Sequence, residues 1–295
     1  MYRNFDLKDL EREYSPSSCI DDISPYIQQY IEQSQQALSA AKTQQKVLTD
    51  LPYNNHEDGQ KEQILDLFLP FETVTNKQKL HVYIHGGYWQ ELSKNESCFA
   101  ATNFQQQGYH LAVVNYALAP KASLSEIVNQ CRQSLVWLYQ HAEQYGYDKN
   151  EITLSGSSAG GHLVMMMALT DWSKYLDVED NIVKGICAVS GIFDLTPVAQ
   201  TYINEPLQLT HQEIAENSPL LLAIENKQLE GCDIIIAYGD NETSEFKRQS
   251  LAMKMHLEKM SINVTFKEVA QRNHFDVILD LAKPETWLSQ QVFAQ

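Results

Sequence analysis

Hydrophobic residues in this chain form short apolar runs that alternate with helical stripes from about residue 62 onward. Runs of about four to eight apolar residues between turn residues are typical of buried strands, and apolar positions three or four apart are typical of amphipathic helices. The runs predict these strands: Ile64–Leu69, Lys79–Ile84, Gly108–Asn115, Glu151–Leu154, Val183–Val189, Cys232–Tyr238 and Val264–Val269. The stripes predict helices over about 25–47, Leu124–Tyr145 and Phe246–Met260.

This alternation indicates an α/β fold, with a mostly parallel sheet covered by helices on both faces. The 295 residues suffice for one large domain, and we expect a single domain over 1–295. Within it we expect an N-terminal helical extension over 1–50 and a turn-rich connection over Leu51–Gln60. Prolines at 197, 206 and 219 interrupt the alternation and predict a small cap-like insertion over about 194–226.

The composition is that of an ordinary globular protein, with 43% hydrophobic and 20% charged residues. The formal net charge is −16. Such a field repels polyanions, so we expect no nucleic acid and no membrane surface among the partners. The charge balance says little about the substrate. We expect a small-molecule substrate, and the sequence leaves the oligomeric state open between a monomer and a homodimer.

The five cysteines are widely spaced and contain no CxxC pair. An odd, scattered set disfavours disulfide scaffolds and zinc sites, and it favours the cytoplasm. No pair of histidines has convincing metal-ligand spacing, so we expect no metal site. The N-terminus lacks the apolar region of a signal peptide, and no apolar stretch reaches the length of a transmembrane helix.

Candidate chemistry begins at Gly156-Ser157-Ser158-Ala159-Gly160, which reads as G-x-S-x-G. A predicted strand precedes the motif and an apolar helical segment follows it, which is the context of a nucleophile elbow. The frame selects Ser158 as the nucleophile. The alternative is an ordinary Gly/Ser turn between a strand and a helix.

A second glycine-containing loop, His85-Gly86-Gly87-Tyr88-Trp89, directly follows the strand that ends at Ile84. Such a loop turns backbone N–H groups toward a substrate oxygen, and the residue after the nucleophile completes the oxyanion hole. We expect donors at Gly87, Tyr88 and Ala159, with Gly86 shaping the turn. Tyr88 and Trp89 are candidate aromatic walls for a flat substrate, although core packing is an equally good interpretation of Trp89.

His274 is the best candidate for the general base, because it follows the last predicted strand and completes the chain order Ser, acid, His. We expect His85 to brace the glycine loop and His162 to be structural. The acid is open at this point, since Asp240, Glu242 and Glu245 all follow the strand that ends at Tyr238. Loop chemistry alone leans toward Asp240.

Together these segments resemble the α/β-hydrolase family of kynurenine formamidases and their esterase relatives, over nearly the whole chain. The resemblance rests on these segments: Glu13–Ser18, Leu65–Pro70, His85–Trp89, Gly156–Gly161 and Glu242–Phe246. The His-Gly-Gly-x-Trp loop is the most specific of them. The family's triad acid lies three residues before a Glu-Phe pair, which implies Glu242. Eukaryotic members usually have aspartate there, so this glutamate departs from the pattern.

The resemblance implies a Ser158–His274–Glu242 triad that needs no cofactor. It implies an arylformamidase, which converts N-formylkynurenine to kynurenine and formate in tryptophan catabolism. A short-chain carboxylesterase is the alternative on the same scaffold. A catalytically silent hydrolase fold that serves as a binding protein is a remote third interpretation.

Overall fold

The sheet is the frame of the molecule. The computed structural model describes residues 2–54, 61–72, 78–178 and 181–295. Within them, eight strands form one sheet in the order β1-β2-β4-β3-β5-β6-β7-β8. The strands are Val47–Pro52 (β1), Ile64–Phe68 (β2), Gln78–Ile84 (β3), His110–Val114 (β4), Tyr147–Ser157 (β5), Val183–Val189 (β6), Asp233–Asn241 (β7) and Val264–Asn273 (β8).

Most strand pairs are parallel, which confirms the expected α/β architecture. The pairs from β4 through β8 are all parallel, whereas β2 is antiparallel to both β1 and β4. The carboxyl ends of the six parallel strands therefore meet at one edge of the sheet. Binding sites of open α/β sheets are built at that edge.

Alternate residues of each central strand enter two different cores. In β4, Ala112 and Val114 join one core, while Leu111 and Val113 join the other. In β7, Ile234 and Ile236 belong to the first core, and Ile235 belongs to the second. A strand buried on both faces appears as a continuous apolar run, which is why these strands were visible in the sequence.

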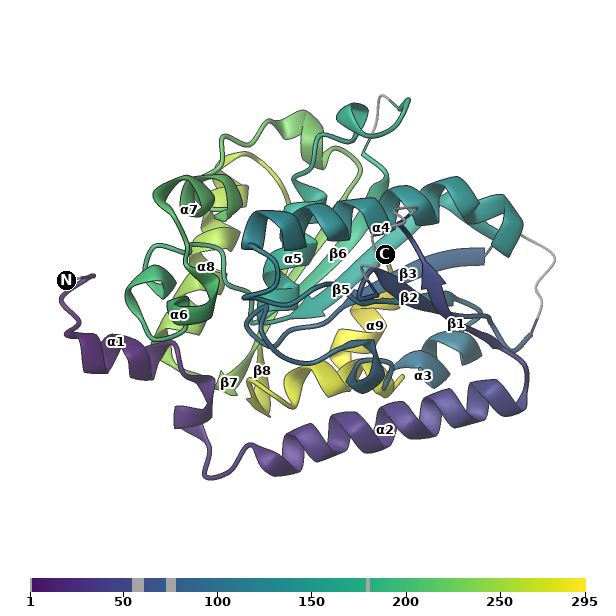
Figure 1. Ribbon diagram of the computed structural model, residues 1–295, viewed down its shortest axis with the longest axis horizontal. Helices are drawn as coiled ribbons and strands as arrows, with labels where there is room; N and C mark the ends of the chain where they lie inside the picture. The colour runs from purple at the N-terminus through teal and green to yellow at the C-terminus, as the bar shows by residue number, and fades with distance from the viewer. Residues whose placement is uncertain (1, 55–60, 73–77, 179–180) are drawn as a thin grey trace.

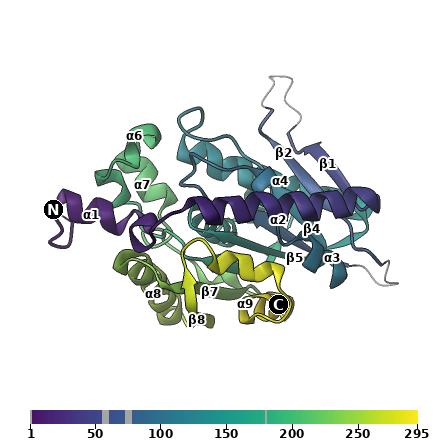
Figure 2. The ribbon, with the colours of Figure 1, turned by 90° about the horizontal axis from the view of Figure 1, so that it is seen from below.

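Helices cover both faces of the sheet (Figures 1 and 2). One core packs under α4, α5 and α8, and the other under α2, α3 and α9. The helices are Leu7–Glu13 (α1), Ser24–Thr43 (α2), Ala101–Gln106 (α3), Leu124–Tyr145 (α4), Ala159–Ala168 (α5), Asn204–Leu207 (α6), His211–Asn217 (α7), Ser244–Lys259 (α8) and Trp287–Phe293 (α9).

Helix α4 has the predicted bounds because both of its ends carry local signals. Ser123 and Glu126 form a reciprocal capping box at the N-terminus. Gly146 ends the helix with a φ of 83°, a left-handed conformation that glycine adopts without steric cost.

The predicted helix over 25–47 is too long, and the helical extension over 1–50 is wrong at its end. Helix α2 stops at Thr43, and β1 begins at Val47. Gln45 takes a φ of 55°, and the N–H groups of Gln45 and Lys46 donate to the carbonyls of Lys42 and Ala41. This is a Schellman cap, which usually contains glycine. Here the left-handed residue is a glutamine. The sequence therefore contains no glycine that would have predicted the end of the helix.

Two further predictions concern the connections between the regular elements. In the expected turn-rich segment Leu51–Gln60, Leu51 and Pro52 belong to β1, while residues 55–60 lie outside the described part of the chain. The insertion over 194–226 contains α6 and α7, which lie near α1 (Figure 1). Both short helices thus lie on the side of the fold that the N-terminus approaches.

Candidate active site

Ser158 occupies a strained turn between β5 and α5. Its φ of 58° and ψ of −120° are unusual for a residue with a side chain. The N–H of Ser158 donates to the carbonyl of Val189 on the neighbouring strand at 2.9 Å, which holds the turn. A non-glycine residue keeps such strain only where its surroundings enforce it, and such residues concentrate at functional sites.

The glycine loop after β3 lies directly against this turn. A Cβ on Gly86 would lie 2.6 Å from the carbonyl oxygen of Ser157 and 3.4 Å from Cβ of Ser158. Glycine is therefore required for the loop to approach the serine. Gly87 has a φ of 92°, and Tyr88 follows with a φ of 50°.

The expected oxyanion donors lie on both sides of the contact between the glycine loop and the Ser158 turn. Among the described residues, the N–H groups of Gly87 and Tyr88 donate to no backbone carbonyl. Ala159 is the first residue of α5, so its N–H has no acceptor within the helix. Unused N–H groups at a helix start favour developing negative charge.

His274 and Glu242 form a buried hydrogen-bonded pair at the same sheet edge. Nδ1 of His274 lies 2.8 Å from Oε2 of Glu242, and the two residues are 4% and 7% exposed. The second carboxylate oxygen, Oε1, accepts from the N–H of Gly239 and from the hydroxyl of Ser190, both at 2.6 Å. With Nδ1 donating to the acid, Nε2 of His274 is left to accept a proton.

Asp240 faces away from this pair. Its carboxylate is exposed and accepts from the N–H groups of Gln271 and Arg272 at 2.9 and 3.2 Å. These backbone hydrogen bonds lower the pKa of Asp240. Glu245, the third acid of this loop, is paired with Arg248 instead. The structure thus brings Glu242, and neither of the other two, to His274.

A cavity of about 250 Å³ opens over Ser158 and His274. Aromatic residues form much of its wall: Tyr30, Tyr83, Tyr88, Phe99, Tyr202 and Phe275. Apolar positions come from Ile23, which directly precedes α2, from Ile27 of α2, and from Ile203 and Ile278. None of the described residues that line the cavity is lysine or arginine. The cavity therefore suits a flat or apolar group beside the reacting carbonyl.

Of the two candidate aromatic walls, only Tyr88 lines the cavity. Trp89 is fully buried and packs its ring edge-on to His162 at 5.1 Å between centroids. Of the two interpretations of Trp89, the structure therefore supports core packing and contradicts contact with substrate, because the side chain is buried behind the loop and does not line the cavity.

Two further histidines brace the site without taking part in the Glu242 pair. His85 stacks on Tyr116 at 4.1 Å and bonds through Nδ1 to the carbonyl of Gly86. Nε2 of His162 donates to the carbonyl of Asn217 at 2.7 Å, which ties α5 to the insertion. Burial lowers the pKa of each to about 4, so both rings are neutral at pH 7.

Sequence reasoning missed Ser190, which holds the acid in place. Ser190 is fully buried, directly follows β6 and has a φ of 49°. The available signal was the Ser190-Gly191 pair at the end of a buried strand, on the edge where the other site residues lie.

Among the described residues, no group of three or more His, Cys, Asp or Glu is arranged to hold a metal ion.

Comparisons with known proteins agree with this arrangement. The BD-FAE family model matches residues 65–245, more than half of the chain. Kynurenine formamidase of Danio rerio is 36% identical, over 95% of this chain and 93% of its own length. The Salmo salar kynurenine formamidase is also 36% identical, over 98% and 96%.

The chain belongs to the kynurenine formamidase family. Membership confirms the expected resemblance and the expectation of a hydrolase enzyme. A solved structure from Silicibacter sp. TM1040 superposes with a TM-score of 0.81 at 24% identity, covering 97% of this chain and 99% of that one. Esterase B of Lactobacillus rhamnosis superposes with a TM-score of 0.68 at 18% identity, covering 93% and 94%. These two similarities show the α/β-hydrolase fold alone.

Proposed function

We propose that this enzyme is an arylformamidase that hydrolyses N-formylkynurenine to kynurenine and formate through Ser158, His274 and Glu242. The observation that carries the proposal is the buried hydrogen bond between His274 Nδ1 and Glu242 Oε2, beside a cavity that Ser158 also lines. Family membership supports the formamide substrate, since both fish relatives carry that name.

In the proposed first step, Oγ of Ser158 attacks the formyl carbon while Nε2 of His274 takes its proton. Glu242 holds the imidazole in the required tautomer and stabilises the imidazolium. The oxyanion accepts hydrogen bonds from the N–H groups of Gly87, Tyr88 and Ala159. Each well-placed donor contributes about 3 kcal/mol of transition-state stabilisation.

The tetrahedral intermediate then collapses, and the C–N bond breaks as His274 gives its proton to the departing aryl amine. Formate remains as an ester on Ser158. Water attacks that ester with His274 as the base, and formate leaves as the serine is reprotonated. Aromatic side chains of the cavity, Tyr88 among them, fit the flat aryl group.

A short-chain carboxylesterase is the second candidate. Glu242 at a position where the family's eukaryotic members usually have aspartate favours it, and so do the apolar side chains of Ile27 and Ile203 in the cavity wall. Both activities use the same nucleophile, so substitutions at the triad do not separate them.

A side-by-side assay of N-formylkynurenine and p-nitrophenyl acetate decides between these candidates, with Ser158→Ala as the blank. We expect a higher kcat/KM for the formamide and a loss of at least about 10³-fold in the variant with either substrate. Efficient ester cleavage with negligible formamide cleavage would leave only the carboxylesterase. Failure of a fluorophosphonate probe to label Ser158 would point to a non-catalytic binding protein.

The surroundings of the site fit two further parts of the proposal. We infer that residues 194–226 act as a cap, since Tyr202 and Ile203 line the cavity and Asn217 accepts from His162.

We also propose that the enzyme works in the cytoplasm, which its five free cysteines support. No helix in the described residues is long and apolar enough to cross a membrane. Gel filtration tests whether the enzyme is a homodimer.

A further inference from the structure

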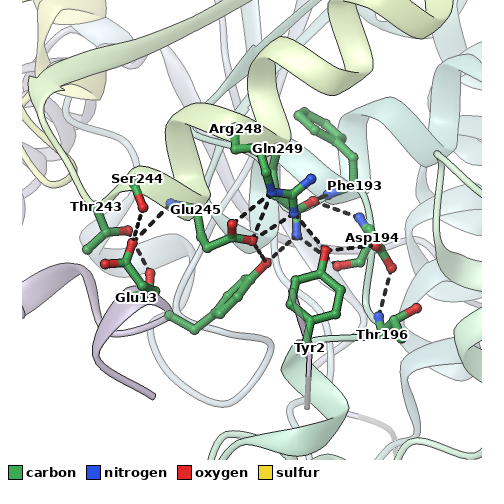
Figure 3. Close-up of polar contacts among 11 residues, drawn as sticks. Tyr2, Glu13, Phe193, Asp194, Thr196, Thr243, Ser244, Glu245, Arg248 and Gln249 are labelled. Atoms are coloured by element: carbon green, nitrogen blue, oxygen red, sulfur yellow. Dashed lines mark hydrogen bonds and ion pairs between the residues drawn. The ribbon is translucent and has the colours of Figure 1, made fainter. Parts of the chain in front are cut away.

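Two segments that carried the family resemblance, Glu13–Ser18 and Glu242–Phe246, lie against each other in the fold (Figure 3). The hydroxyl of Thr243 donates to the carbonyl of Glu13 at 2.6 Å, and the hydroxyl of Ser244 donates to Oε2 of Glu13 at 2.7 Å. The N–H of Glu245 donates to the same oxygen at 3.2 Å. We call residues 2–20 the N-terminal strap. The strap is thus bonded to the loop that carries Glu242.

The strap is held by a second, buried cluster around Glu245. Glu245 is 3% exposed and pairs with Arg248 at 2.8 Å. Its Oε2 also accepts from the hydroxyl of Tyr14 at 3.0 Å. Gln249 donates to that hydroxyl at 2.8 Å. Burial raises the pKa of Tyr14, so the phenol keeps its proton and its role as donor to the carboxylate.

The cluster extends to the start of the chain (Figure 3). Arg248 donates to the hydroxyl of Tyr2 at 3.0 Å, and Tyr2 lies 3.4 Å from a carboxylate oxygen of Asp194. Arg248 is partly exposed, but Glu245 is buried, so displacing the arginine would leave a buried carboxylate without compensation. The position of Tyr14 is therefore fixed from several sides.

Tyr14 in turn contacts the glycine loop His85–Trp89, which we call the oxyanion loop. The hydroxyl of Tyr88 donates to the backbone carbonyl of Tyr14. Tyr88 has a φ of 50°, a conformation that costs free energy for a bulky residue and persists only under restraint. The strap supplies one such restraint, at the residue whose N–H is an expected oxyanion donor.

The same strap also forms part of the cavity. Ser15, Pro16 and Ser17 line it, directly after Tyr14. The hydroxyls of Ser15 and Tyr202 lie 2.9 Å apart, which joins the strap to the 194–226 insertion. The strap therefore contacts three parts of the site: the loop that carries Glu242, the oxyanion loop and the 194–226 insertion.

We propose that Tyr14 is a positioning residue for the oxyanion hole. Its hydroxyl is anchored by Glu245 and Gln249 on α8, and its carbonyl holds Tyr88, so the donors stay aligned with the loop of Glu242. This proposal rests on the proposed serine-hydrolase function but not on the choice of substrate. A displacement of about 1 Å at a catalytic group can reduce the rate about 100-fold, so the loss of this alignment should appear in kcat.

The experiment compares Tyr14→Phe, Tyr88→Phe and the double variant with Tyr147→Phe, using p-nitrophenyl acetate. Tyr147→Phe is the matched control, because Tyr147 is also buried and also donates to a backbone carbonyl, that of Leu138 at 2.6 Å. Tyr147 begins β5, at the end of the strand opposite Ser158. Each variant keeps its ring and its backbone N–H.

We expect each of the two site variants to lower kcat about 10-fold with KM within about twofold, and to slow fluorophosphonate labelling of Ser158 in parallel. The double variant should lose little more than the worse single variant, because both substitutions break one connection. Tyr147→Phe should lower Tm without changing kcat.

The proposal is wrong if the site variants change kcat no more than Tyr147→Phe does, or if their losses combine in full in the double variant. It is also wrong if every loss of kcat follows the loss of Tm across the four variants. Failure of the function itself has a different signature, since wild type would then show no more turnover than Ser158→Ala in the same assay.

Discussion

The hydroxyl of Ser190 donates to Oε1 of Glu242 at 2.6 Å, while Oε2 of the same carboxylate faces His274 at 2.8 Å. The backbone N–H of Gly239 donates to Oε1 as well. The two donors fix the rotation of the carboxylate, so that one oxygen alone is presented to the imidazole. A glutamate has one more rotatable bond than an aspartate, and these donors compensate for that freedom.

Ser190→Ala should therefore lower kcat about 10-fold while leaving KM nearly unchanged, because the carboxylate loses one of the two donors that orient it. Steady-state kinetics at a fixed pH near neutrality measures both parameters.

Ser134→Ala is the matched control for this prediction. Ser134 is also fully buried, and its hydroxyl donates to a backbone carbonyl in the middle of α4. It should lower stability without altering kcat or KM. Identical kinetics for Ser190→Ala and Ser134→Ala would show that Ser190 has no positioning role.

The identity of the acid gives a second prediction. Glu242→Gln should lower kcat by roughly 10³- to 10⁴-fold, because an amide at this position no longer fixes the imidazole tautomer. Asp240→Asn should stay within about threefold of wild type, since Asp240 is exposed and its carboxylate accepts from the backbone N–H groups of Gln271 and Arg272 on the next strand, not from His274. Full activity of Glu242→Gln together with loss of activity in Asp240→Asn would reverse the assignment.

The sequence could not settle this choice, because Asp240 and Glu242 lie two residues apart in the same acidic loop. What separates them is tertiary: Asp240 is held by the backbone of Gln271 and Arg272, whereas Glu242 turns toward His274. The positions of strands and helices were easier to predict from the sequence than the identity of the acid. The apolar run Val183–Val189 and the capped helix Leu124–Tyr145 carry their signals locally, and both have the predicted bounds.

The failures concern conformations and contacts that residue type does not encode. The end of α2 depends on a left-handed glutamine, and glutamine usually avoids positive φ. The burial of Trp89 depends on its tertiary position behind the loop, where it packs against His162. Ser190 was missed because its role depends on a carboxylate 52 residues away in the sequence.

Gly86→Ala should damage catalysis more than stability. Its Cβ would lie 2.6 Å from the Ser157 carbonyl, so the loop has to move away from Ser158 and the oxyanion donors move with it. We expect kcat to fall about 100-fold. Gly231→Ala is the control, because Gly231 has a φ of 69° but no atom within 4 Å of the place its methyl group would take, and it should keep wild-type kcat. Equal kcat in the two variants would mean that the loop does not need this close approach.

Stability at low pH depends on buried neutral histidines, and His81 provides the sharpest test. Its two ring nitrogens contact the hydroxyls of Thr153 and Ser155 at 2.8 and 2.7 Å, and burial lowers its pKa to about 3. In the unfolded chain, His81 has a pKa of about 6.5. Between about pH 3 and 6.5 the unfolded chain therefore binds a proton on His81 that the folded protein does not bind. The free energy of unfolding therefore falls as the pH drops from about 6.5 toward 3, by about 1.4 kcal/mol per pH unit for this residue.

His81→Gln should remove that contribution, so the slope of unfolding free energy against pH should decrease by about 1.4 kcal/mol per unit over this window. The slope is the informative quantity, because the substitution also disturbs packing and lowers stability at every pH. Urea titrations at several pH values measure it, with exposed His211→Gln as the control that should leave the slope unchanged. An unchanged slope in His81→Gln would mean that the folded protein accepts the proton on His81 as readily as the unfolded chain does.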